Sequence, residues 1–219
     1  MYVHVNAAMS ADGKLSSRER EQVEISGPDD FARVDRIRAD SDAVMVGVGT
    51  VLADDPSLTV DDPDLIAERE ARGDQPQPAR VVADSRVRTP EDARVLDDEA
   101  ETYLLVSEAA PVDYVDEMAA AGATVIQAGE DRVDLTEAFD KLASHGVERL
   151  MIEGGGELIA SAFAAELVDE LTVFVGPMII GGRDAPTLAD GEGFIEEFPS
   201  LSLADVERVD EGVLLRWRT

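Results

Sequence analysis

The sequence predicts a single α/β domain, residues 1–219, with helices flanking a mostly parallel central sheet and antiparallel strands in its carboxyl-terminal part. Short apolar runs alternate with helical patterns in most of the chain, which is typical of parallel strands joined by crossover helices. After Leu171 the last strand patterns follow one another without a helix of useful length between them, which favours antiparallel pairing. With 44% hydrophobic residues, a chain of 219 residues can fill a core.

Strands are placed on the apolar runs, and helices on the segments with helical periodicity. The expected strands are residues 2–9, 43–48, 80–83, 102–106, 123–127, 149–152, 170–175, 201–208 and 213–218. The expected helices are residues 29–39, 111–121, 135–144 and 157–165.

Local signals mark where helices begin and end. Ser26 is a candidate cap for the helix at 29–39, and Pro28 and Asp29 suit its first turn. Gly122 suits the end of the helix at 111–121. The charged, proline-containing stretch 61–78 is expected to be a surface excursion with a short helical pattern at most.

The chain is strongly acidic, with 48 Asp and Glu against 19 Lys and Arg and a net charge of -29. Nucleic acids and anionic membranes are bound through clustered cations, so both are excluded as partners. The cations are 17 Arg and 2 Lys, and most of the acids are expected to be solvated surface. This composition resembles that of proteins from salt-loving cytoplasms, where salt screens self-repulsion.

Cysteine is absent, which excludes disulfides and thiolate metal sites or nucleophiles. His4 and His145 have no acids at ligand spacing, so no metal site is expected. The amino terminus lacks a cationic start followed by an apolar run, and no segment is apolar for long enough to cross a bilayer. We expect a soluble cytoplasmic protein.

The first candidate site is a strand, three glycines at 154–156 and a helix. Glycines let backbone amides approach a phosphate, and the helix start favours negative charge. A tight strand-to-helix turn explains the same glycines. A second strand leads into Thr50 and Asp54, whose hydroxyl and carboxylate could bind a nucleotide. The alternative is that Thr50 caps a helix and that the Asp-Asp-Pro run at 54–56 ends one.

A third strand ends at Asp84 and Ser85, followed by Arg86 and Arg88. A hydroxyl and a guanidinium in this place suit a phosphate monoester such as the 2′-phosphate of NADP, and a surface Arg balancing nearby acids is the alternative. Lys14 lies in a loop after the first strand, at the sheet edge where ligands bind. Its charge suits a substrate phosphate or an oxyanion, and the alternative is a lone exposed lysine on a turn.

Taken in order, these segments resemble the reductases of riboflavin biosynthesis, which have a dihydrofolate-reductase-like fold. The matching blocks are residues 6–14, 36–59, 82–85, 153–156, 167–171 and 177–182, and they extend over nearly the whole chain. Bacterial bifunctional relatives have a zinc deaminase domain ahead of the reductase, whereas this chain begins at the first reductase strand and has no Cys. It is therefore similar to the stand-alone archaeal form, and its composition fits a haloarchaeal member.

The resemblance implies an oxidoreductase that uses NADPH, or NADH, to reduce the ribosyl group of a phosphorylated ribosylamino-pyrimidine to a ribityl group. It implies a homodimer, for which residues 171–180 could supply the surface. The catalytic residues implied are Lys14 and Glu153. The substrate-binding residues implied are Asn6, Lys14, Arg38 and Glu153. The cofactor-binding residues implied are Thr50, Asp54, Asp84, Ser85, Arg86, Val87, Gln127, Gly154, Gly155, Gly156 and Glu157.

Two other functions fit part of the pattern. A dihydrofolate-reductase-like enzyme could act on another pterin or pyrimidine, but a sugar phosphate explains the charge of Lys14 better than a neutral ring does. A sensor that binds NADP without catalysis would contain the same cofactor-binding segments. Some relatives have a basic residue where this chain has Asp61, so the substrate phosphate is expected at Lys14, Arg38 or residues 16–20.

Overall fold

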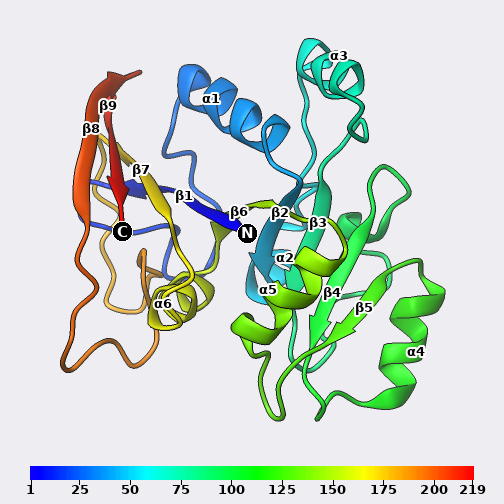
Figure 1. Cartoon of the computed structure of the whole chain (residues 1–219). Coiled ribbons are helices and arrows are strands. Elements are labelled where there is room, and N and C mark those ends of the chain that lie inside the picture. Colours follow the sequence, from blue (N-terminus) through cyan, green and yellow to red (C-terminus); the bar gives the residue numbers. More distant parts are fainter. The chain divides into compact units, whose positions relative to one another are not determined.

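The computed structural model describes residues 1–219, which divide into two compact units. The first unit contains residues 35–151 with Met1, and the second contains residues 2–34 and 152–219. The chain passes from one unit to the other within helix α1 (Pro28–Ala39) and within strand β6 (Arg149–Gly154) (Figure 1). The predicted α/β class is confirmed, and the single domain stays a prediction. None of the helices is long and apolar enough to span a membrane.

The first unit contains four parallel strands that pair in the order β2-β3-β4-β5. They are β2 (Ala43–Gly47), β3 (Ala79–Ala83), β4 (Thr102–Val106) and β5 (Thr124–Gln127). The helices here are α2 (Val48–Asp54), α3 (Pro63–Arg72), α4 (Val112–Ala120) and α5 (Leu135–Ser144), with a short 3-10 helix, η1 (Arg94–Leu96). Because the strands are parallel, their carboxyl ends meet at one edge of the sheet.

Helices cover both faces of this sheet. On one face, Val82 and Leu104 belong to a buried cluster with Val51 of α2 and Met118 of α4. Side chains alternate along a strand, so Tyr103 points to the opposite face. There its ring packs against that of His145, directly after α5, with the ring centroids 5.3 Å apart. The predicted flanking by helices is thus confirmed within this unit.

The buried phenol of Tyr103 should make stability fall at high pH. Burial, together with a hydrogen bond to Glu101, raises its pKa from 10.0 to about 12. Above pH 10 the unfolded chain therefore ionises first, and stability is lost as pH rises towards the folded-state pKa. We expect Tyr103→Phe to lose less stability than the wild type over this interval, measured by denaturant unfolding. Equal losses in the two proteins would contradict the assignment.

The stretch 61–78 contains a full helix, so the prediction of a short helical pattern at most is wrong. In α3, the Asp62 side chain accepts from the Asp64 amide, and Gly73 ends the helix with a φ of 90°. Arg69 is only 4% exposed and donates to the carbonyls of Ala39 and Ser41, at 2.7 Å each. This buried arginine holds α3 against the end of α1 and the residues that follow it. The charged composition of the stretch does not reveal such a contact.

The second unit contains strands that pair in the order β1-β7-β9-β8. They are β1 (Tyr2–Ser10), β7 (Glu170–Gly176), β8 (Ser202–Val209) and β9 (Gly212–Arg218), and helix α6 (Gly156–Ala164) follows β6. β1 is parallel to β7, whereas the β7–β9 and β8–β9 pairs are antiparallel, as predicted. The bounds of β4 and α5 are as predicted, and other predicted elements shift by at most two residues.

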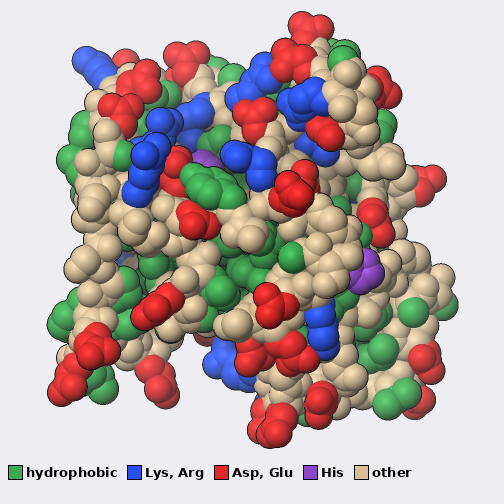
Figure 2. Space-filling view, viewed as in Figure 1, with side chains coloured by type: hydrophobic (Ala, Val, Ile, Leu, Met, Phe, Trp, Pro, Cys, Tyr) green, Lys and Arg blue, Asp and Glu red, His purple; other side chains and the backbone are tan.

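The start of α1 is capped from a distance. The Asp210 carboxylate accepts from the amides of Asp29 and Asp30, at 3.2 and 3.0 Å. This carboxylate takes the role that the sequence assigned to Ser26. A Cβ on Gly27 would lie 2.6 Å from the Asp210 carboxyl carbon, so a larger residue there would displace the capping carboxylate. Elsewhere, acids are scattered over the visible surface of both units, as expected for solvated charges (Figure 2).

Candidate active site

In the first unit, predicted cofactor residues lie where parallel strands end. Thr50 follows β2, Asp84 and Ser85 follow β3, and Gln127 is the last residue of β5. Ligands of open α/β sheets bind at this edge, beyond the carboxyl ends of the strands. The structure therefore places these residues at one edge of the first unit's sheet.

Helix α2 continues directly from β2 and has no side-chain cap. Gly47 is the cap residue, and Thr50 is half-buried within the first turn, so Thr50 does not cap the helix. The helix ends at Asp54, and Asp55 follows in the left-handed conformation with a φ of 41°. Asp54 is exposed by surface area, yet nearby protein desolvates its carboxylate enough to raise its pKa. The cause is partial exclusion of water, which makes the charged carboxylate less favourable than it is in free solution.

Asp84 shapes the turn after β3. Its side chain is fully buried, and Oδ2 accepts from the amides of Arg88 and Thr89, at 2.5 and 2.7 Å, and from the Thr89 hydroxyl at 2.9 Å. Oδ1 has no hydrogen-bond partner, and the Arg88 Nε lies 3.9 Å from it. The carboxylate thus organises residues 84–89 in this structure.

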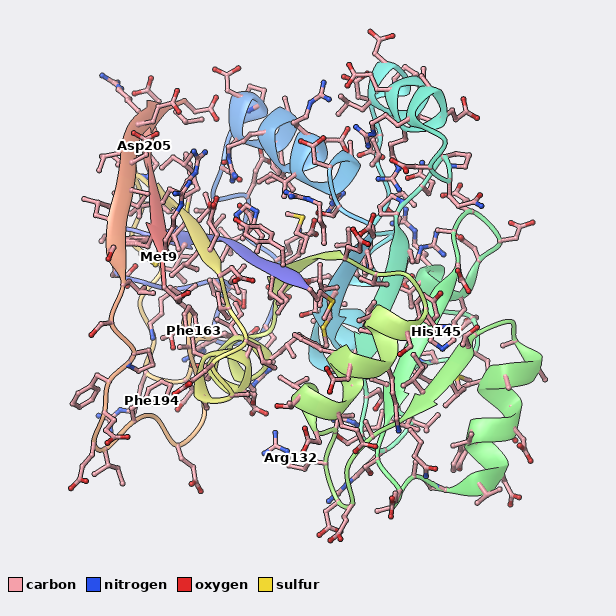
Figure 3. All side chains as sticks on the ribbon, viewed as in Figure 1. Met9, Arg132, His145, Phe163, Phe194 and Asp205 are labelled. Atoms are coloured by element: carbon pink, nitrogen blue, oxygen red, sulfur yellow. The ribbon has the colours of Figure 1, made fainter.

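Ser85 is connected to two neighbouring loops. Its Oγ accepts from the Val133 amide at 3.0 Å, and its carbonyl accepts from the Ser107 hydroxyl at 2.8 Å. Gln127 Nε2 in turn donates to the Ser107 carbonyl at 3.4 Å. Sequence reasoning missed Ser107 and Val133, although Ser107 directly follows a buried strand, as Asp84 does. Arg132 projects from the loop that contains Val133 (Figure 3).

Val87 and Arg86 point to different surroundings. Val87 has a φ of 53° and is 8% exposed, as part of the apolar cluster under α2 and α4. Arg86 is exposed, and it makes no hydrogen bond or ion pair within the chain. In a protein with so few cations, a guanidinium without a carboxylate partner is available to an anion.

Arg38 lies in the last turn of α1. Its Nη1 donates to the Thr59 carbonyl at 2.9 Å. This contact connects the end of α1 to the segment that follows α2. The position of the guanidinium is therefore set in part by the protein backbone.

In the second unit, Lys14 is held mainly by its backbone. Its amide donates to the Ser10 hydroxyl at 3.0 Å, and its carbonyl accepts from the Ser10 amide at 2.8 Å. It also forms an antiparallel bridge with Thr187. Its ammonium donates to the Ala185 carbonyl at 3.1 Å. One short segment, residues 185–190, therefore contacts both the backbone and the side chain of Lys14; we call it the strap.

A tight turn precedes Lys14. Gly13 has a φ of 80°, and its amide donates to the Ser10 carbonyl at 2.9 Å. Asp12 accepts from the Ser10 hydroxyl at 2.6 Å and from the amides of Ile180 and Gly181, at 3.0 and 2.8 Å. The Ser10 hydrogen bond, followed by the backbone contacts, lowers the pKa of Asp12. This carboxylate therefore anchors the Lys14 loop to the chain after β7.

The glycine segment packs against the same strap. Gly155 precedes α6 with a φ of 89°. The tight strand-to-helix turn, which is the alternative explanation of these glycines, is therefore present. A Cβ on Gly156 would lie 2.4 Å from the Thr187 carbonyl oxygen and 2.6 Å from Asp190 Oδ2. The Asp190 amide donates to the Gly156 carbonyl at 3.0 Å, while its side chain accepts from the Thr187 hydroxyl at 2.5 Å. Lys14 and Gly156 thus both contact the strap, and sequence reasoning missed this shared contact.

Asn6 lies in the middle of β1 and is 6% exposed. Its Oδ1 accepts from Arg33 Nη2 at 2.8 Å. On the same strand, His4 Nε2 lies 2.8 Å from the Thr172 hydroxyl, in a part-buried contact with β7. Sequence reasoning missed Arg33, because its contact with Asn6 joins residues far apart in the chain.

The predicted residues are divided between the units. Arg38, Thr50, Asp54, Asp84 to Val87 and Gln127 belong to the first, and Asn6, Lys14 and residues 153–157 to the second. A cavity of about 460 Å³ in the first unit contains none of them. It opens around Ala79 and Tyr103, near the amino ends of β3 and β4, at the opposite edge from Ser85. We therefore do not assign it to the predicted cofactor.

Comparison with known proteins identifies the family. The model of the RibD C-terminal domain matches residues 1–215. The chain is 49% identical over 211 residues to the 2,5-diamino-6-ribosylamino-4(3H)-pyrimidinone 5′-phosphate reductase of Archaeoglobus fulgidus, with 96% of this chain and 94% of that relative aligned. The enzyme of the same name from Methanothermobacter thermautotrophicus is 49% identical over 202 residues, with 92% and 89% aligned.

A solved structure is similar in fold. The pyrimidine reductase-like protein of Corynebacterium diphtheriae superposes with a TM-score of 0.86 at 18% identity, over 99% of this chain and 91% of that protein. Because the family model extends over nearly all of the sequence, and archaeal relatives match it over nearly their whole length, the chain belongs to the RibD C-terminal domain family.

Proposed function

We propose that the protein reduces the ribosyl group of 2,5-diamino-6-ribosylamino-4(3H)-pyrimidinone 5′-phosphate to a ribityl group, as a step of riboflavin biosynthesis. The observation that carries this proposal is the match to two archaeal reductases that bear this substrate's name, over 94% and 89% of their lengths. Two structural features support an anionic ligand of this kind. They are the unpaired guanidinium of Arg86 and the loop position of Lys14.

The cofactor in this proposal is NADPH, which would supply a hydride. The candidates to bind it in the first unit lie at or just after the strand ends, among them Thr50, Ser85 and Gln127, and the candidates in the second unit are the glycines at 154–156. Arg86 would pair with the 2′-phosphate, because guanidinium and phosphate match bidentately. Preference for NADPH over NADH then depends largely on one exposed side chain.

The reaction proposed is addition of hydride to C1′ of the ring-opened sugar imine, with a proton delivered to its nitrogen. Lys14 would hold the substrate phosphate or a developing oxyanion, and Glu153, near the end of β6, would handle the proton directly or through water. Asn6 and Arg38 would contact the substrate. Much of the rate would come from orienting the reacting carbon towards the hydride donor.

The decisive experiment follows NADPH oxidation by absorbance, in about 2 M KCl to screen the protein's self-repulsion. The ribosylamino-pyrimidinone phosphate is the substrate, and the product is analysed by mass spectrometry. We expect a gain of two hydrogens. NADPH binding without oxidation would favour a sensor, and turnover of another pterin or pyrimidine alone would favour a different reductase.

Arg86→Gln should weaken NADPH binding while leaving NADH binding unchanged. Removing one charge-assisted contact to the 2′-phosphate should raise the NADPH dissociation constant about tenfold to a hundredfold. Cofactor titrations of both nucleotides measure this effect. Arg208→Gln is the matched control, because Arg208 is 75% exposed on β8 and pairs only with Glu211. Equal weakening of NADH would contradict the assignment of Arg86 to the 2′-phosphate.

We further propose that the protein is a cytoplasmic homodimer adapted to high salt. Its acidic, lysine-poor composition supports the salt adaptation. Ile179, at the end of the segment proposed for the dimer surface, is 75% exposed, which supports an apolar contact there. Light scattering over a range of KCl concentrations tests the dimer, and a monomer at every concentration would contradict it.

A further inference from the structure

Arg33 of α1 connects two buried polar side chains. Its Nε donates to Asp30 Oδ1 at 2.8 Å, and its Nη2 donates to Asn6 Oδ1, also at 2.8 Å. Asp30 is 1% exposed and Asn6 is 6% exposed, so the contacts are largely shielded from water. The Asp30 carboxylate balances the charge of Arg33, which lets the guanidinium remain beside the neutral amide.

This contact fixes which way the Asn6 amide points. A guanidinium has five N–H donors and no acceptor, so only the carbonyl oxygen of an amide can face it. The rotated amide would place N–H against N–H. The Asn6 Oδ1 is therefore directed at Arg33, and the Nδ2 group is directed away from it.

The Nδ2 group has no partner in the protein. Arg33 provides the one hydrogen bond made by the Asn6 side chain, through Oδ1. Thr172, opposite Asn6 on β7, has its hydroxyl beside His4 Nε2. If Nδ2 were fully buried, it would be a buried polar atom without a hydrogen-bond partner, as Arg33 Nη1 is, but it is not one of those atoms. Nδ2 therefore reaches solvent, and Asn6 offers two N–H donors to a ligand.

We propose that Arg33 is a positioning residue that fixes Asn6 as a hydrogen-bond donor, so that Asn6 recognises an acceptor oxygen of the substrate. The inference rests on the proposed function, in which Asn6 faces the phosphorylated ribosylamino-pyrimidine. It adds the direction of the hydrogen bond and a residue that sets it. Nη1 of Arg33 is buried without a partner, and an unsatisfied buried donor requires an explanation, of which a functional role is one.

Asn6→Asp tests the direction of the hydrogen bond. One carboxylate oxygen still accepts from Arg33, while the other replaces the outward donor with a negative acceptor. We expect an unchanged or higher Tm and unchanged NADPH binding. The KM for the substrate should rise so that kcat/KM falls about tenfold to a hundredfold, as for loss of a polar contact that becomes repulsive. A purely structural role of Asn6 would leave kcat/KM unchanged.

Substitutions of Arg33 test its role in positioning. Gln at this position can accept as well as donate, so Arg33→Gln frees the Asn6 amide to rotate and should lower kcat/KM. Arg33→Lys, which only donates, should restore most of the loss. Asn6→Asp should cost less in the Arg33→Gln background than in the wild type, because the two residues act as one unit. Arg36→Gln is the control, because the Arg36 guanidinium pairs with Glu68 on the surface.

The outcomes separate this inference from the proposed function. If the wild type neither binds nor reduces the substrate, the proposed function fails and the inference fails with it. If the wild type turns over but Asn6→Asp keeps wild-type kcat/KM, only the inference fails. Additive effects of the Asn6 and Arg33 substitutions would also overturn it. Should Arg33→Gln not fold, the Asn6→Asp comparison, with NADPH binding as the folding control, decides the question.

Discussion

Lys14→Ala is expected to remove most of the turnover while the protein stays folded. Deleting the ammonium leaves a substrate phosphate or oxyanion without its cation, which should lower kcat/KM about a hundredfold to a thousandfold. The fold should survive because the loop is held by backbone contacts, to the Ser10 amide and hydroxyl and to Thr187. Steady-state kinetics and circular dichroism measure the two effects.

The other lysine of the chain provides the control for this experiment. Lys141 lies on α5, where its ammonium donates to Glu137 and to the Gln127 carbonyl at 2.7 and 2.6 Å. This ion pair is exposed, so Lys141→Ala should cost little stability. The variant should retain activity. Wild-type kcat/KM in Lys14→Ala would remove Lys14 from both its proposed roles.

Gly156→Ala is expected to damage both stability and activity. The added Cβ would lie 2.4 Å from the Thr187 carbonyl, a backbone atom that moves only if the strap moves. Overpacking of this kind costs about 1–3 kcal/mol of unfolding free energy. A displaced strap would also shift Lys14, and a misplacement of about 1 Å can cost about a hundredfold in rate. Denaturant unfolding and kinetics on the same preparation measure both.

A glycine without steric restraint provides the comparison. Gly49 lies in α2, and a Cβ added at this position would have no atom within 4 Å. Gly49→Ala should therefore stabilise the protein by about 0.5–1 kcal/mol, because alanine is the better helix former. If Gly156→Ala had the stability of Gly49→Ala, the strap would not be packed against the glycine segment as described.

Most strands and helices could be predicted because their apolar pattern is local. Sequence also indicated the sheet edge where Thr50, Ser85 and Gln127 lie, since ends of parallel strands meet there. Contacts across long chain separations could not be predicted. Asp210 caps α1 from 181 residues away, and nothing in the sequence near either residue indicates this contact.

The roles of individual polar side chains were equally hidden. Asp84 follows a strand, as a ligand-binding acid would, yet its Oδ2 accepts three hydrogen bonds from its own turn. The residue type and its position show that a carboxylate is available to accept hydrogen bonds. Only the geometry shows which groups donate to it.

The division of the chain has a consequence for the order in which the protein folds during synthesis. The first unit is nearly continuous in sequence, whereas the second joins residues 2–34 to residues 152–219. β1 is made first, but its parallel partner β7 begins at Glu170 and cannot pair with it until the ribosome has passed that point. Contacts between residues so distant in the chain form slowly. The nascent strand β1, which includes Asn6, therefore stays unpaired with β7 while residues 11–169 are made.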